Sequence, residues 1–226
     1  MYIDIIKGPG AAAARITMAP NEKCVAEAGA LIAMRGRFDL KTSTSDKKRS
    51  IIGGLKRMLG GESFFLNHFT ADSQGGELIF GAAIPGDMLS IELHGPGIIV
   101  EGGAFVLRSD GIEMELGWQG VKSIFAGEGL FWLKLSGRGH TVVNSFGAIY
   151  PVDIDGDFLV DTGHIVAFEE SLKFSLTKAG KSWISSILGG EGLVCRFSGK
   201  GRIWCQSHHL SDFGGILGPL LAPKTN

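Results

Sequence analysis

Apolar and polar residues alternate over short stretches of this chain, and glycines separate the stretches. Residues 112–116, Ile-Glu-Met-Glu-Leu, alternate apolar and charged side chains, which predicts a strand with one face in solvent. The apolar run 98–107 predicts a buried strand, and its glycine pair indicates a bulge or a close backbone approach. We expect many short strands, with a turn at 94–97 and hairpins turning at 137–139 and 198–201.

Three nine-residue segments of the chain resemble one another: residues 25–33 (VAEAGALIA), 99–107 (IVEGGAFVL) and 159–167 (LVDTGHIVA). Each carries a carboxylate two residues before a glycine, in the pairs Glu27/Gly29, Glu101/Gly103 and Asp161/Gly163. A second block follows each segment, and its Gly-Glu pairs are Gly61-Glu62, Gly127-Glu128 and Gly190-Glu191. Two blocks in the same order, three times, predict a triplicated β-unit of roughly 60–70 residues.

This repeat predicts a single compact β structure over residues 1–226 rather than separable domains. Its three pseudo-repeats span roughly 1–80, 81–145 and 146–210, and an apolar tail, 211–226, follows them. The tail is expected to pack on the body, to contact a partner subunit or to anchor weakly at a membrane interface. No run approaches the length of a transmembrane helix and the start lacks a signal-peptide pattern, so we expect a cytoplasmic protein.

Composition adds few constraints to this picture. Glycine is abundant, with 35 of 226 residues, and this supports a strand-and-turn architecture. Lys plus Arg number 22 against 23 Asp plus Glu, which excludes a globally basic nucleic-acid binder. Three cysteines, Cys24, Cys195 and Cys205, are too few for a disulfide framework. We expect Cys195 and Cys205 to face each other, as reduced thiols, across the hairpin at 198–201.

The phrase Gly-Gly-Glu-Ser-Phe-Phe-Leu-Asn-His-Phe-Thr at 60–70, with weaker echoes in the other two units, resembles the altered-inheritance-of-mitochondria family. The resemblance covers roughly residues 1–210, and the family, of unknown function, is grouped with the trp RNA-binding attenuation protein-like β fold. It implies an all-β, internally repeated, double-stranded β-helix-like architecture with short helical turns, assembling into a homotrimeric ring. It implies no catalytic residues. The attenuation protein's binding motif is not present, so nucleic acid is not an expected partner.

Several groups of residues could carry chemistry, and each has a structural alternative. The equivalent glutamates Glu62, Glu128 and Glu191 could form a carboxylate ring that binds a cation or an amine, or could tie down turns by accepting backbone N–H bonds. Residues 153–157, Asp-Ile-Asp-Gly-Asp, resemble a calcium loop, but the glycine is fourth rather than sixth, and a hairpin turn at 155–156 explains them.

Two further motifs also fail on spacing. Residues 180–182, Gly-Lys-Ser, lack the earlier glycine of a phosphate loop, because Ser175 occupies its position. A zinc site would need an unusual ligand spacing with two adjacent histidines, and its four residues would be Cys195, Cys205, His208 and His209. We therefore predict no metal and no cofactor.

One local concentration of basic residues falls among apolar residues at helical spacing, and it comprises Lys47, Lys48, Arg49, Lys56 and Arg57. A basic amphipathic helix can lie on an anionic membrane or present a solvated charged face, and both interpretations stay open.

The sequence therefore predicts a non-enzymatic assembly or interaction protein, a homotrimer that contacts a protein partner or a membrane surface. The alternative is a small-ligand or RNA binding module that uses crevices of the ring. An enzyme of cupin-like shape is disfavoured, because the chain lacks a His-x-His-type cluster.

Overall fold

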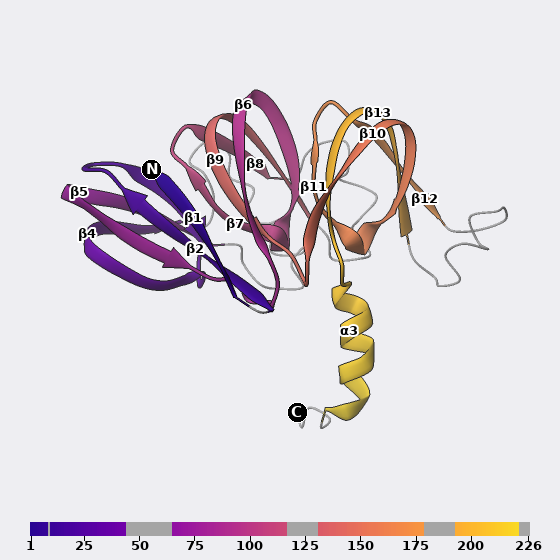
Figure 1. Cartoon of the computed structure of the whole chain (residues 1–226), viewed down its shortest axis with the longest axis horizontal. Helices are drawn as coiled ribbons and strands as arrows, with labels where there is room; N and C mark the ends of the chain where they lie inside the picture. The colour runs from indigo at the N-terminus through magenta and orange to yellow at the C-terminus, as the bar shows by residue number, and fades with distance from the viewer. Residues whose placement is uncertain (9, 44–64, 117–130, 179–192, 222–226) are drawn as a thin grey trace.

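The computed structural model of the protein describes residues 1–8, 10–43, 65–116, 131–178 and 193–221. In these residues thirteen strands belong to one antiparallel sheet, and one α-helix follows the last strand. Figure 1 shows the strands as three groups side by side along the long axis of the molecule. The all-β prediction is confirmed.

The elements follow one another with short connections. Their bounds are β1 (Tyr2–Gly8), β2 (Ala11–Met18), β3 (Lys23–Glu27), β4 (Leu31–Ser43), β5 (Leu66–Phe80), β6 (Met88–Glu101), η1 (Gly102–Ala104), β7 (Phe105–Ser109), β8 (Ile112–Leu116), β9 (Trp132–Asn144), β10 (Ile149–Asp161), η2 (Thr162–His164), β11 (Ile165–Glu169), β12 (Lys173–Lys178), β13 (Leu193–Gln206), α3 (Leu210–Leu217) and η3 (Gly218–Leu220).

The strand order of the sheet is β1-β2-β5-β3-β7-β9-β6-β11-β13-β10. Off this path, β4 pairs with β5, β8 with β9 and β12 with β13. Three ribbons of long strands dominate the sheet: β4 with β5, β6 with β9 and β10 with β13. Two junctions, β3 with β7 and β6 with β11, join one ribbon to the next.

Each long ribbon has two glycines opposite each other near its middle, namely Gly36 and Gly76, Gly95 and Gly137, and Gly156 and Gly199. Five of these six glycines have φ between +109° and +129°, a region that side chains with a Cβ rarely adopt. Paired glycines let both strands bend together without ending the ladder. Figure 1 shows β6 and β10 curving over at the upper edge of the molecule.

The predicted reversals at 94–97, 137–139, 155–156 and 198–201 are therefore wrong. All four lie inside continuous strands, in β6, β9, β10 and β13. The local composition misled the prediction because a bend shared by two paired strands needs the same glycines as a turn. Only long-range pairing distinguishes the two.

The same error displaced the cysteines. Cys195 and Cys205 lie on one strand, β13, opposite Val160 and Tyr150 of β10, so they do not face each other across a hairpin. All three cysteines are free and buried. They pack as small apolar side chains in the core.

The core consists of three hydrophobic clusters, one for each group of strands. Junction residues cross between the groups: Val25 packs in the central cluster, Val106 in the first cluster and Ile99 in the last. Because neighbouring groups exchange side chains in this way, apolar packing is continuous along the described strands.

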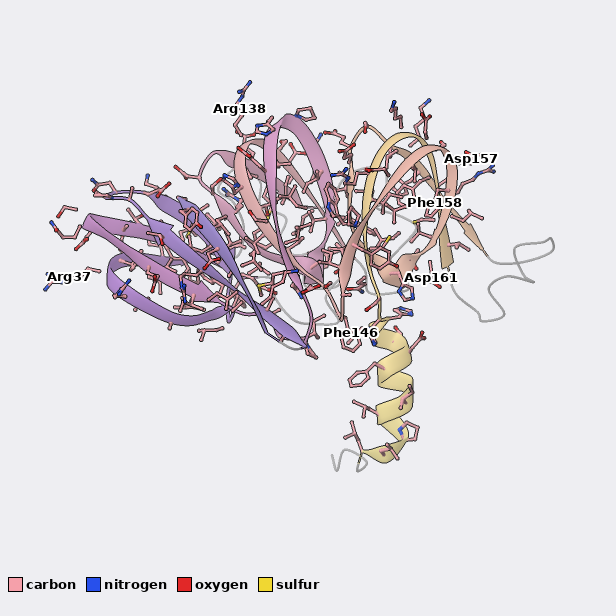
Figure 2. All side chains as sticks on the ribbon, in the orientation of Figure 1. Arg37, Arg138, Phe146, Asp157, Phe158 and Asp161 are labelled. Carbon is pink, nitrogen blue, oxygen red and sulfur yellow. The ribbon has the colours of Figure 1, made fainter. Side chains whose placement is uncertain are left out.

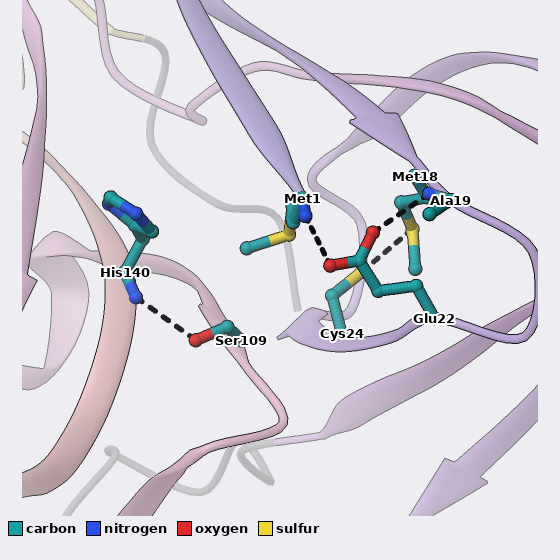
Figure 3. A network of polar contacts seen from close by, with 7 residues as sticks. All are labelled: Met1, Met18, Ala19, Glu22, Cys24, Ser109 and His140. Atoms are coloured by element: carbon teal, nitrogen blue, oxygen red, sulfur yellow. Dashed lines mark hydrogen bonds and ion pairs between the residues drawn. The ribbon is translucent and has the colours of Figure 1, made fainter.

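The first strands are fastened by one carboxylate. The Glu22 side chain accepts hydrogen bonds from the Met1 amino group and, at 2.8 Å, from the Ala19 N–H (Figure 3). Beside it, the Cys24 Sγ lies 3.7 Å from the Met18 Sδ. These contacts tie the β1–β2 hairpin to β3, which carries the first junction.

Candidate functional site

Several predicted positions lie outside the described residues. They are the basic residues Lys47, Lys48, Arg49, Lys56 and Arg57, the Gly-Glu pairs Gly61-Glu62, Gly127-Glu128 and Gly190-Glu191, and the loop at 180–182. The helical turn expected at 121–126 also lies there. The other marker glycines, Gly29, Gly103 and Gly163, are in the described part of the chain.

The three carboxylate–glycine pairs all lie where a strand ends in a tight turn. Asp161 ends β10, and its Oδ1 accepts a hydrogen bond of 2.9 Å from the Gly163 N–H. Glu101 ends β6, and backbone N–H groups of η1 stabilise its carboxylate form. Glu27 ends β3, and its backbone carbonyl accepts from the Ala30 N–H at 3.3 Å. Each turn therefore redirects the chain into the next strand.

Two of these carboxylates form a coupled pair. Burial raises the pKa of Glu101 to about 7, although N–H bonds from the η1 backbone act in the opposite direction. Burial, and then repulsion from Glu101, raises the pKa of Glu27 to about 7. The junction of β3 with β7 places Glu27 beside the turn that follows Glu101. This pair is the strongest electrostatic perturbation among the described carboxylates.

The third turn supports the base of the C-terminal helix. The Gln206 Nε2 donates to the Gly163 carbonyl at 2.8 Å, and the His164 Nδ1 lies 2.8 Å from the Gln206 carbonyl oxygen. The rings of His164 and His209 have centroids 5.7 Å apart. A Cβ on Gly163 would lie 2.0 Å from the His209 Cδ2, so only glycine leaves room for this imidazole.

The candidate zinc residues do not come together. Cys195 and Cys205 point into the core, whereas the His208 ring lies 5.2 Å from the Phe146 ring. Within the described ranges, no group of three or more His, Cys, Asp or Glu side chains is arranged to hold a metal ion. The aspartates of the calcium-like segment instead pair with β13, Asp153 with Arg202 at 2.6 Å and Asp157 with Arg196.

The helix α3 extends from the body with every residue exposed (Figure 1). The ring of Phe213 lies 5.2 Å from that of Phe146, and it is the contact that holds the helix near the sheet. The large apolar side chains of α3 and the residues after it are exposed, and they are Leu210, Phe213, Ile216, Leu217, Leu220 and Leu221. None of the described helices is long and apolar enough to cross a membrane.

A second exposed apolar surface lies on β4, at the opposite end of the molecule (Figure 1). Ile32, Met34 and Leu40 of this strand are exposed. The sequence analysis missed this surface, since the segment 25–33 resembles two other segments whose last residues are buried. A signal existed: the first and last copies of a repeat have no neighbour on one side.

The family model described as "Mitochondrial biogenesis AIM24" matches residues 4–208 of this chain. The chain belongs to this family. The resemblance inferred from residues 60–70 is thereby confirmed.

Two relatives of this AIM24-family chain come from Streptococcus pyogenes. A protein of serotype M6, described as uncharacterized, is 31% identical over 180 residues, which are 78% of this chain and 72% of that protein. A crystal structure from a structural genomics programme superposes with a TM-score of 0.78 and 26% identity, covering 97% of this chain and 99% of that one. The AIM24-family fold described above is therefore similar to one observed by crystallography.

Proposed function

We propose that this AIM24-family protein is a non-enzymatic assembly protein, which forms homo-oligomers and uses α3 to attach them to a protein partner. The observation that carries the proposal is the row of exposed apolar side chains on α3 and η3. Large exposed apolar patches on soluble proteins typically mark interaction sites.

The apolar side chains of α3 lie on one face of the helix. Leu210, Phe213 and Leu217 recur at intervals of three and four residues, and Ile216 lies beside them. Ser211 and Gly215 lie on the opposite face. This spacing fits a helix that lays its apolar side into a groove of another protein.

The charge of the helix favours a protein groove over an anionic membrane. Asp212 is the one charged residue of α3, and no Lys or Arg is present to meet lipid headgroups. Gly214, Gly215 and Gly218 also lower its intrinsic helix propensity. Contact with a groove would offset that cost.

Native mass spectrometry of the full chain tests the oligomer. We expect a homo-oligomer, with three copies as the family resemblance implies, and no bound small molecule. A monomer at all concentrations contradicts the assembly function, and a reproducible extra mass favours the ligand-binding alternative.

Site-specific photo-crosslinking tests the attachment. We expect benzoylphenylalanine in place of Ile216 to form a discrete adduct with one protein in cells of the source organism, and binding to be reconstituted with that purified protein. The same probe in place of Ser211, on the polar face, should form no adduct. Equal adducts at both positions contradict the groove, and binding of the parent to phosphatidylcholine vesicles instead indicates a lipid surface.

A further inference from the structure

The sheet has one unpaired edge at each end of the molecule. Among the described strands, β4 pairs with β5 alone and β10 pairs with β13 alone. Figure 1 places β4 and β10 at opposite ends of the long axis. Unpaired N–H and C=O groups along such edges are templates for pairing with another strand.

Inside the chain, the corresponding edges are paired in one fixed register. At the first junction, Ala26 of β3 lies opposite Leu107 of β7. At the second, Val100 of β6 lies opposite Ala167 of β11. In both cases the second residue of one nine-residue segment (25–33, 99–107, 159–167) meets the ninth residue of the next segment.

Three bulges show that these segments also share local geometry. Along each ribbon the pairing register shifts at the same segment positions: between Leu31 and Ala33, between Phe105 and Leu107, and between Ile165 and Ala167. The start of β4 is thus shaped like β7 and β11, which pair with a preceding segment. It has no preceding segment within its own chain.

Burial identifies the same gap on β4. Ile32 is 63% exposed, whereas the equivalent Val106 of β7 is 1% exposed. Met34 is 59% exposed, whereas the equivalent Phe168 of β11 is 1% exposed. The side chains are apolar at both kinds of position, but only the internal ones have a neighbour.

The end of β10 is exposed in a complementary way. Phe158 is 39% exposed, whereas the equivalent Ile98 of β6 is 3% exposed at its junction with β11. Figure 2 shows Phe158 at the end of the molecule far from Arg37 of β4. Each end therefore lacks what the other end presents.

We propose that two copies of the chain join head to tail, with residues 158–160 of one copy pairing antiparallel with residues 33–35 of the next. The register follows the internal junctions, so that Val160 lies opposite Ala33, Leu159 opposite Met34 and Phe158 opposite Arg35. This inference rests on the proposed homo-oligomer and names its interface. Because the two surfaces differ, the contact is heterologous and closes into a ring when the rotation per copy allows it.

Charge supports the same partner. The strand β4 carries Arg35, Arg37 and Lys41 against one carboxylate, Asp39. The strand β10 carries four carboxylates and no Lys or Arg, although Asp153 and Asp157 already pair with arginines of β13. A basic edge that meets an acidic edge favours head-to-tail contact over contact between two identical edges.

Disulfide trapping tests the register. In the double variant Met34→Cys/Leu159→Cys, the two thiols are directly opposite each other across the interface and on one face of the sheet. We expect mild oxidation to give a ladder of covalent oligomers that ends at the number of copies in the ring. The control Ala33→Cys/Leu159→Cys is one residue out of register, which places the thiols on opposite faces, and we expect it to stay unlinked.

Charge insertion tests the interface without cysteines. Ile32→Lys/Met34→Lys changes two exposed side chains, so the monomer should fold, and we expect more than a tenfold loss of oligomer affinity by native mass spectrometry. Leu40→Lys changes an exposed residue of the same strand outside the pairing and should keep the parent oligomer.

The outcomes separate this inference from the proposed function. A parent oligomer that survives Ile32→Lys/Met34→Lys, with equal linking by both cysteine variants, overturns the interface and leaves the assembly function in place. A monomeric parent overturns both.

Discussion

Gly137 of β9 lies opposite Gly95 of β6, at the bend of the central ribbon, and both have positive φ. Their surroundings differ. A Cβ on Gly137 would lie 2.4 Å from the Gly111 carbonyl oxygen, whereas a Cβ on Gly95 would meet nothing within 4 Å. The two residues share a backbone requirement, but only Gly137 also needs the space.

Alanine substitutions should separate these two requirements. We expect Gly95→Ala to lower the free energy of unfolding by about 1 kcal/mol, through backbone strain alone. Gly137→Ala adds a clash with a fixed carbonyl and should cost more than about 2 kcal/mol. Urea denaturation of both variants measures the difference, and equal losses would show that crowding at Gly111 has no effect.

Stability should depend on pH through Glu27 and Glu101. Their pKa values are about 7 in the folded protein and near 4.5 as the ordinary value, so the folded state binds more protons between these limits. Stability should therefore fall as pH rises from about 4.5 to about 7, and stay constant above that.

The variant Glu27→Gln tests this pair. It removes one buried charge and the repulsion on Glu101, so above about pH 7 it should be more stable than the parent by about 1–3 kcal/mol. Near pH 4.5 the two proteins should be equal. Denaturation curves at several pH values check this, with Glu113→Gln, an exposed glutamate of β8, as the matched control. A constant difference across pH would contradict the coupling.

The thiols should be unreactive in the folded protein. Burial raises the pKa of Cys24 and Cys195 to about 12 and that of Cys205 to about 11, with carboxylates adding to the effect at the first two. Because the thiolate is the reactive form, iodoacetamide at about pH 8 should label none of them in the folded state. All three should react in denaturant, and rapid labelling of the folded protein would contradict their burial.

The apolar side chains of α3 should contribute little to folding in the absence of a partner. Ile216→Ser changes a side chain that is 69% exposed, so we expect the free energy of unfolding to change by no more than about 0.5 kcal/mol. Phe80→Ala, at a fully buried position of β5, should cost about 3–5 kcal/mol. Thermal and urea unfolding compare the two, and a similar loss in both would show that α3 packs on the body.

Part of the candidate site could be predicted from local sequence. The carboxylate–glycine pairs at 27–29, 101–103 and 161–163 were found as repeats, and all three lie at strand ends. The coupling of Glu27 with Glu101 was not predictable, because these residues are 74 positions apart (101 − 27) and a strand junction brings them together. The exposed edge of β4 was missed for the same reason.

The sequence by itself determined the all-β class and the glycines at which the chain changes direction, because alternation and missing side chains are local properties. It did not determine whether Gly95 or Gly137 reverses the chain or bends two paired strands together. The tertiary structure decided that, along with the separation of Cys195 from Cys205, through ladder hydrogen bonds between residues far apart in sequence. Local patterns set what a segment can do, and long-range pairing selects which of those conformations buries its apolar face.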